Sequence, residues 1–130
     1  MSHKTHAHFD RAGIERLIQT YFDGLYDGDV DKLATVFAPS SSLTWSQEGH
    51  LETVSREVWF ERVRARPSPR SRGLARDDGI LLLDHAGPDT ALVKVKCQIP
   101  PQHFTDYLSL LRIDGHWQVV QKVYSVVMQI

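Results

Sequence analysis

Two stretches decide the fold of this chain: FTDYLSLLRI at residues 104–113 and HWQVVQKVY at residues 116–124. Both are rich in β-branched, aromatic and aliphatic residues, which favour strands, and only Asp114 and Gly115 separate them. A two-residue turn of type I′ requires positive φ at both central positions, and the pair Asp–Gly tolerates it. The sequence therefore predicts a long β-hairpin from residue 103 to residue 127.

Two more strands are predicted upstream of this hairpin, at residues 80–84 and 90–99. The joints hold turn-forming residues, Gly87–Pro88 in the first and Pro100–Pro101 in the second. We therefore expect four antiparallel strands in sequence order. The preceding stretch, residues 66–78, shows no apolar period and is predicted to be a loop.

The N-terminal part predicts two consecutive helices. Asp10 can cap the free amides of the first helix. Its apolar residues recur at helical spacing and form one stripe: Ile14, Leu17, Ile18, Tyr21, Phe22 and Leu25. Gly28 ends this helix, and Asp29 caps a short second helix that continues to Phe37.

A third helix is predicted after Ser55, with Trp59, Phe60 and Val63 on its buried face. A strand at residues 43–47 precedes it. Glu48, Gly49 and His50 form a turn after that strand, and a brief return strand follows at residues 51–53.

Helices that precede a contiguous run of strands favour an α+β fold, with the helices packed on one face of a curved antiparallel sheet. A length of 130 residues fits one domain, which we place at residues 9–130. Residues 1–8 are predicted to be a disordered tail. The histidines of this tail are either simply solvated or a weak metal-binding stretch: His3, His6 and His8.

Composition excludes several classes of function. The formal net charge of −1 gives no global field that would attract nucleic acid or an anionic membrane. Cys97 is the single cysteine, so no intramolecular disulfide can form. The sequence shows no signal peptide, membrane span, metal motif or phosphate loop. We therefore expect a cytoplasmic protein without a metal or cofactor and without nucleic-acid or membrane partners.

The order of these elements and their local residues resemble the nuclear transport factor 2-like superfamily. The likeness lies in the segment YFDGLYDGD at residues 21–29, in the helix at residues 33–37 and in the Asp–Gly hairpin that ends in Trp117. Within the superfamily, residues 105–117 are similar to a TDYLSLL-IDG-W stretch of small bacterial proteins labelled putative lumazine-binding. The resemblance covers residues 9–124. It implies a cone-shaped half-barrel, in which a bent sheet wraps a long helix and leaves a pocket, and it implies dimers through the open sheet face.

An aromatic pocket is the candidate binding site. We expect six residues to line it: Tyr21, Trp45, Trp59, Phe60, Tyr107 and Ser109. Ser109 should oppose Tyr21 and add a second neutral donor. Aromatic side chains of this kind can stack on a flat heterocycle, and the resemblance implies a lumazine-like or pteridine-like one. Alternatively, these aromatic residues form only the core between helix and sheet.

The ketosteroid isomerases belong to the same superfamily and combine a carboxylate base with a tyrosine donor and a protonated aspartate donor. The resemblance places Tyr21 at their tyrosine donor, Trp45 at their base and Ser109 at their buried acid. Neither Trp45 nor Ser109 titrates near neutral pH, so we expect no ketosteroid isomerase activity.

Three other residues are candidate bases: Asp106, His50 and His103. Residues alternate between the two faces of a strand, so a pocket-facing Ser109 predicts that Asp106 faces an interface or solvent. Both histidines are predicted at a turn or strand start and partly exposed. Cys97 alternates with apolar residues, which predicts an inert buried thiol.

Six of the ten arginines fall within fifteen residues: Arg62, Arg64, Arg66, Arg70, Arg72 and Arg76. They form either a solvated loop or a basic rim that recruits an anionic ligand or an acidic partner.

Leu92, Leu108 and Leu110 are predicted on the sheet face opposite the pocket, and an apolar face of this kind favours a homodimer. Three functions follow from these patterns. The first is a small-molecule-binding module, and the second is a cofactor-free acid–base enzyme, such as a SnoaL-type cyclase, isomerase or dehydratase with Tyr21 as donor. The third is a structural module with a filled pocket. An ionisable group at the floor of an open pocket would favour the enzyme.

Overall fold

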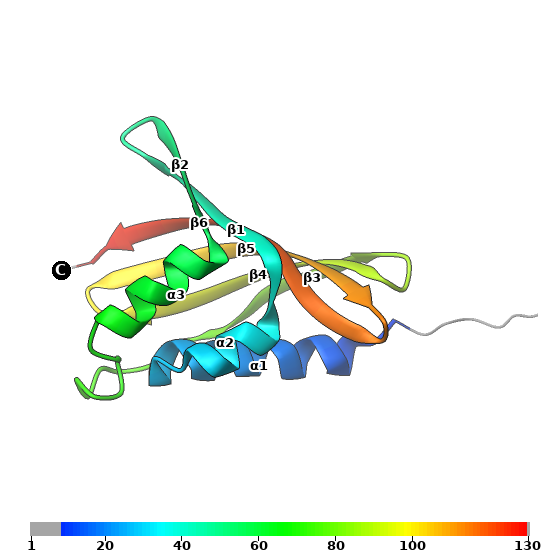
Figure 1. Cartoon of the computed structure of the whole chain (residues 1–130), viewed down its shortest axis with the longest axis horizontal. Helices are drawn as coiled ribbons and strands as arrows, with labels where there is room; N and C mark the ends of the chain where they lie inside the picture. Colours follow the sequence, from blue (N-terminus) through cyan, green and yellow to red (C-terminus); the bar gives the residue numbers. More distant parts are fainter. Residues whose placement is uncertain (1–8, 130) are drawn as a thin grey trace, which may run out of the picture.

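The computed structural model of the protein describes residues 9–129. Over this range the elements are, in order, α1 (Arg11–Asp27), α2 (Val30–Val36), β1 (Phe37–Gln47), β2 (His50–Ser55), α3 (Arg56–Ala65), β3 (Gly79–Ala86), β4 (Thr90–Ile99), β5 (Gln102–Ile113) and β6 (His116–Met128). The strands form one curved, unclosed sheet in the order β2-β1-β6-β5-β4-β3, and the helices lie against one of its faces (Figure 1). The predicted α+β half-barrel is confirmed. The predicted histidine tail, residues 1–8, lies outside the described residues.

The β5–β6 hairpin is the longest pairing of the sheet. It runs antiparallel from Gln102 opposite Met128 to Ile113 opposite His116. Asp114 has φ 50° and Gly115 has φ 79°, as the type I′ turn requires. The predicted hairpin is therefore confirmed, as are the antiparallel pairings of β3 with β4 and of β4 with β5.

The edge of the sheet formed by β1 and β2 was predicted too short. β1 begins at Phe37 and pairs parallel with β6, whereas the prediction began at residue 43. Proline cannot donate to a sheet ladder, yet Pro39 is accommodated because the register shifts between Phe37 and Ser42, the nearest paired residues on either side. β2 likewise extends to Ser55, the residue that caps α3.

Side-chain caps start all three helices where the sequence indicated. The carboxylate of Asp10 accepts a hydrogen bond from the Gly13 amide at 2.9 Å and another from Nε1 of Trp117 at 3.3 Å. Asp29 and Ser55 cap α2 and α3 in the same way. Gly28 ends α1 in the left-handed conformation with φ 64°. The Trp117 contact ties the start of α1 to the hairpin turn.

The core lies between the helices and the concave face of the sheet, here called the inner face. Val93 of β4 lies opposite Leu108 of β5, and both are fully buried there. The prediction that Leu108 and Leu110 form a dimer surface was wrong, since they are 0% and 1% exposed against the helices. Leu92 does lie on the other side, here called the outer face, because it pairs with Ser109.

No helix within residues 9–129 is long and apolar enough to cross a membrane.

Candidate functional site

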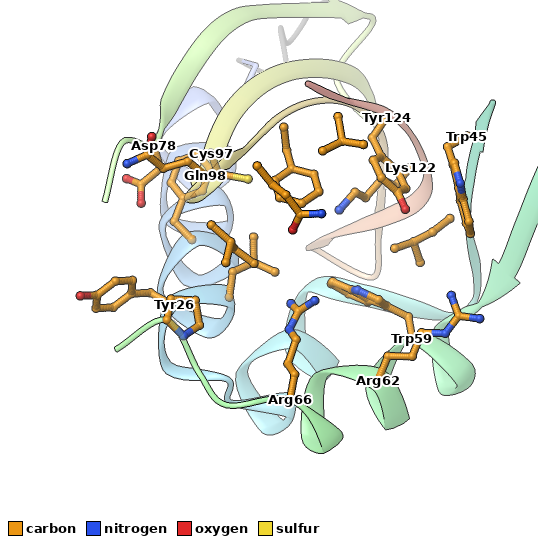
Figure 2. A pocket seen from close by; sticks show the side chains of 18 of the residues that line it. Tyr26, Trp45, Trp59, Arg62, Arg66, Asp78, Cys97, Gln98, Lys122 and Tyr124 are labelled. Carbon is orange, nitrogen blue, oxygen red and sulfur yellow. The ribbon is translucent and has the colours of Figure 1, made fainter. Parts of the chain in front are cut away.

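A cavity of about 500 Å³ opens between the helices and the inner face of the sheet. Its size is typical of pockets that hold small molecules. Six of its lining residues carry the argument below: Trp45, Trp59, Arg62, Arg66, Lys122 and Tyr124. Figure 2 shows these side chains gathered around the opening from β1, α3 and β6.

Aromatic rings make up one side of the cavity. Trp45 and Tyr124 lie with their ring centroids 5.4 Å apart, and Phe104 lies 6.2 Å from Tyr124. The parallel pairing of β1 with β6 brings Trp45 beside Tyr124, since the residues just before them, Thr44 and Val123, are register partners. Trp59 enters from α3. These rings give a ligand flat apolar surfaces to stack on.

Three ionisable side chains form one hydrogen-bonded chain beneath the cavity, here called the Lys122–Tyr21–Asp106 cluster. Nζ of Lys122 donates to the Tyr21 hydroxyl at 2.8 Å, and that hydroxyl donates to Oδ2 of Asp106 at 2.5 Å. Nζ also lies 3.5 Å from the same Asp106 oxygen. Tyr21 and Asp106 are fully buried, and Lys122 is 5% exposed where it meets the cavity.

The register of the sheet explains why these groups meet. Leu108 lies opposite Lys122 and Asp106 lies opposite Tyr124, so all four side chains occupy the inner face. Tyr21 reaches them from the buried side of α1. Burial, together with the charge of Asp106, raises the pKa of Tyr21 well above its ordinary value. Tyr21 therefore remains a neutral hydroxyl that both accepts and donates.

Lys122 is held among aromatic faces. Its Nζ lies 4.8 Å from the ring centroid of Tyr124, 5.1 Å from that of Trp59 and 5.4 Å from that of Tyr21. Cation–π attraction stabilises the ammonium form. The amine thus meets the cavity almost fully buried, with one hydrogen-bond chain behind it.

Asp106 has one carboxylate oxygen to spare. Among the described residues, Oδ1 of Asp106 makes no hydrogen bond although it is buried. A buried polar atom without a partner costs about 1–3 kcal/mol. Oδ1 therefore keeps its full capacity to accept a hydrogen bond.

The mouth of the cavity is cationic. Arg66 directly follows α3, and Figure 2 shows its guanidinium pointing into the cavity, where loss of water lowers the pKa of Arg66. Neither Arg62 nor Arg66 makes an ion pair within residues 9–129, whereas Arg76 also lines the cavity but bonds Asp23 and Asp78 at 3.0 Å each. An anionic group that entered would therefore meet two free guanidinium groups.

The remaining arginines of the cluster found in the sequence lie elsewhere. Arg70 pairs with Asp27 at 2.7 Å. Arg64 and Arg72 are exposed, and neither lines this cavity. The arginine-rich stretch therefore splits between the cavity mouth and the surface.

The structure places four of the six predicted site residues at or beside the cavity. Trp45 and Trp59 line it. Tyr21 lies behind Lys122, and Phe60 packs in the core against Trp59 with ring centroids 5.8 Å apart. A contact of any of them with a ligand remains a prediction.

The placement of Tyr107 and Ser109 in the pocket was wrong. Tyr107 is 44% exposed on the outer face, and Ser109 lies on the same side. Asp106, which was predicted at an interface or in solvent, takes the position opposite Tyr21 instead. The sequence does contain a signal for this inward placement, because residues two apart on a strand lie on the same face. Asp106 therefore shares its face with Leu108 and Leu110, which are apolar.

The other candidates do not gather at the site. His50 is exposed at the start of β2, and His103 is half-buried near the start of β5, as predicted. Cys97 lines the cavity rather than the deep core, and burial raises its pKa from 9.0 to about 12. Its thiol is therefore protonated at neutral pH and a poor nucleophile.

Lys122 is the functional residue that the sequence did not indicate. Alternation from the buried Trp117 and Val119 would place Gln121 inside and Lys122 outside. The register shifts between Ser109 and Leu110, whose partners on β6 are Gln121 and Val119, so Val120 is an extra residue. A β-bulge of this kind reverses the faces beyond it, which turns Lys122 inward. No local residue pattern signals it.

Comparison with known proteins agrees with this architecture. Residues 9–125 match the model of a family described as "Putative lumazine-binding". Aldolase FrzH from Cladobotryum sp. is 41% identical over 39 residues, which span 28% of this chain and 31% of that protein's length.

Two solved structures share the fold. A protein of unknown function from Shewanella baltica, described as NTF2-like (nuclear transport factor 2-like), superposes with a TM-score of 0.81 at 21% identity, covering 92% of this chain and 95% of that one. A protein from Novosphingobium aromaticivorans described as a putative scytalone dehydratase gives a TM-score of 0.67 at 15% identity, with coverage of 92% and 85%.

Proposed function

The chain belongs to the putative lumazine-binding family, and from this premise we propose that its cavity binds a flat, anionic small molecule. The observation that supports this proposal is that aromatic rings line the cavity while its mouth holds cations that lack carboxylate partners. The rings of Trp45, Trp59 and Tyr124 offer stacking surfaces. Arg62 and Arg66 receive the acidic group. A lumazine-like heterocycle is flat and rich in carbonyl oxygens, and it falls within this class in its deprotonated form.

Electrostatics favours an anion over a neutral ligand. A guanidinium in a partly dehydrated site forms charge-assisted hydrogen bonds worth about 1.5–3 kcal/mol each. Arg66 has already lost part of its hydration, which the lowered pKa reflects. An anion restores the interaction that water gave, and a neutral isostere does not.

Binding should be tested with naphthoate and with lumazine, using thermal unfolding and calorimetry. Both probes should stabilise the fold, and at one hundred times its dissociation constant a ligand adds about 2.7 kcal/mol. The neutral naphthamide should bind about tenfold more weakly than naphthoate, because it lacks the charge that Arg66 recognises.

Arg66→Gln should weaken naphthoate binding by about tenfold or more. Arg72→Gln is the matched control, since Arg72 is exposed and does not line the cavity. Equal losses in both variants, or no saturable binding by either probe, would refute the proposal.

A cofactor-free acid–base enzyme is the second candidate. The Lys122–Tyr21–Asp106 cluster supports it, because an ionisable group meets the cavity and connects to a buried carboxyl. The short match to an aldolase is compatible with a ligand that carries a carbonyl group. Trp45 occupies the place of the isomerase base in the resemblance, so we still expect no ketosteroid isomerase activity.

We also propose that the outer face of the sheet forms a homodimer. Tyr107 and Val123 lie opposite each other there and are 44% and 50% exposed. Apolar side chains gathered on an open sheet favour self-association. This surface replaces the Leu108–Leu110 surface that the sequence indicated.

A further inference from the structure

We infer that Lys122 is a reactive amine that forms an imine with an aldehyde or ketone held in the cavity. This inference deepens the proposed binding function and rests on it, since it names the chemical class of the ligand. The ligand would carry an acidic group at one end and a carbonyl group at the other.

Lys122 differs from every other lysine that the structure describes. Lys32 pairs with Asp27 at 2.9 Å, and Lys96 pairs with Asp77 at 2.9 Å. Lys94 lies over the Tyr107 ring on the outer face. Lys122 alone among the lysines of residues 9–129 is buried and lines the cavity.

An amine attacks a carbonyl carbon only as the free base, so Lys122 must first give up a proton. Two hydrogen bonds supply a route, from Nζ to the Tyr21 hydroxyl at 2.8 Å and from that hydroxyl to Asp106 at 2.5 Å. The hydroxyl passes its own proton to Asp106 as it takes one from Nζ. The transfer turns a buried ion pair into two neutral groups, so it leaves no isolated charge in the apolar site.

The carboxyl group suits the role of proton holder. Oδ1 of Asp106 has no hydrogen-bond partner among the described residues. Oδ2 already accepts the hydrogen bond from the Tyr21 hydroxyl, so it is the atom that takes the proton. Tyr21 relays and does not ionise, because burial keeps it neutral.

The covalent step balances without an oxidant or a further reactant. Nζ of Lys122 attacks the carbonyl carbon, a C–N bond forms as the C=O π bond breaks, and one of the two amine protons moves to the carbonyl oxygen to give a neutral carbinolamine. The nitrogen lone pair then expels the hydroxyl group, which leaves as water with the proton returned from Asp106 through Tyr21. A C=N bond remains between the ligand and Lys122, which is covalent catalysis of the kind lysine performs with carbonyl substrates.

The cavity orients a ligand for this step. Arg66 and Lys122 enter it from opposite sides, from the end of α3 and from β6, with the aromatic rings beside them (Figure 2). An acidic group bound by Arg66 leaves the far end of a flat molecule facing Nζ. A bound carbonyl therefore meets this amine at high effective concentration.

Reductive trapping tests the inference. We would incubate the protein at neutral pH with para-carboxybenzaldehyde and cyanoborohydride, which reduces an imine to a stable amine, and locate the label by peptide mass spectrometry. Lys122 should be labelled about tenfold or more faster than Lys32, Lys94 and Lys96, because the bound probe is held beside it. Terephthalate, which lacks the aldehyde, should slow the labelling of Lys122 and leave the surface lysines unaffected.

Two variants separate the relay from the fold. Tyr21→Phe removes the hydroxyl that connects Lys122 to Asp106 and should slow labelling of Lys122 about tenfold or more while terephthalate still binds. Lys122→Met should abolish the labelling that terephthalate slows, and Lys94→Met is the control that should retain it. The site of labelling is read in the unaltered protein, so a variant that fails to fold does not remove the test.

The outcomes distinguish this inference from the binding proposal. Terephthalate binding that depends on Arg66, with Lys122 labelled no faster than the surface lysines, overturns the imine and leaves binding intact. Fast, terephthalate-protected labelling of Lys122 supports both. Uniform labelling without terephthalate binding refutes both.

Discussion

The two faces of β5 differ sharply in the exposure of their side chains. On the inner face, Asp106, Leu108 and Leu110 are at most 1% exposed. On the outer face, Tyr107 is 44% exposed and Ser109 is half-buried. A single strand thus supplies both the centre of the core and an open surface. The core and the ionisable cluster are thus parts of one layer. A substitution in this layer therefore changes both the stability of the fold and the surroundings of the cluster.

On β6 the alternation of buried and exposed residues shifts by one position halfway along the strand. Trp117 and Val119 are buried before the bulge, and Lys122 is buried after it, while Val123 is 50% exposed. The bulge therefore brings a basic group into the inner layer that also holds Asp106, at the point where that layer meets the cavity.

The largest effect should follow from the same charge placed on each face. Leu108→Glu puts a carboxylate without a partner into the core and should cost more than about 5 kcal/mol, which prevents folding. Val123→Glu should remain folded, with a change within about 1 kcal/mol, and should convert the proposed dimer to a monomer. Circular dichroism and light scattering measure the two outcomes. If the parent is a dimer and Leu108→Glu is a folded monomer, Leu108 lies in the interface after all. If the parent is a monomer at micromolar concentration, the proposed dimer is wrong.

A smaller effect is expected from polar groups on the two faces of β5. Asp106→Ala leaves Lys122 buried without its carboxylate and should lower the free energy of unfolding by about 3–5 kcal/mol. Ser109→Ala, three positions along and on the outer face, should change it by no more than about 0.5 kcal/mol. Urea unfolding compares the two. Equal and small losses would mean that the ion pair between Asp106 and Lys122 contributes nothing net.

The smallest effect concerns the pH dependence of stability. Burial raises the pKa of Cys97 from 9.0 to about 12, so the folded protein keeps its thiol proton where the unfolded chain releases it. Between these pH values the folded state binds more protons, and stability therefore falls as pH rises. Cys97→Val should make this fall less steep above pH 9, while Ser109→Ala should leave the slope unchanged. Tyr21 adds a similar loss at higher pH in all three proteins. Urea unfolding of the three proteins at several pH values would measure how the free energy of unfolding changes with pH. Identical slopes for the parent and Cys97→Val would contradict the raised pKa of Cys97.

Local chemistry made much of the fold predictable. The Asp–Gly turn, the three capping side chains and the left-handed Gly28 act within a few residues, and the structure has each of them where the sequence indicated. The parallel pairing of β1 with β6 was not foreseen, because it joins segments with no local signal in common.

The candidate site was predictable only in part, for a related reason. Trp45 and Trp59 were found through their residue type. Ser109 was assigned inward because the resemblance placed it at the buried acid of the ketosteroid isomerases, although the apolar Leu108 and Leu110 indicated the opposite face. Lys122 depends on a bulge in a long-range register, which a single strand sequence does not reveal.

The position of β6 between β1 and β5 also sets the order in which the molecule can assemble. Ser42 and Gln121 pair across the sheet although they are 79 positions apart in the chain. During synthesis, the helices and the strands up to β5 leave the ribosome before β6. The edges of β1 and β5 that pair with β6 therefore stay unpaired until β6 has been made. Pairings between distant segments slow folding and prolong the exposure of such edges. The strand that carries Lys122 thus also joins β1 to β5, and the cavity that Lys122 and Tyr124 line is complete only once this strand has paired.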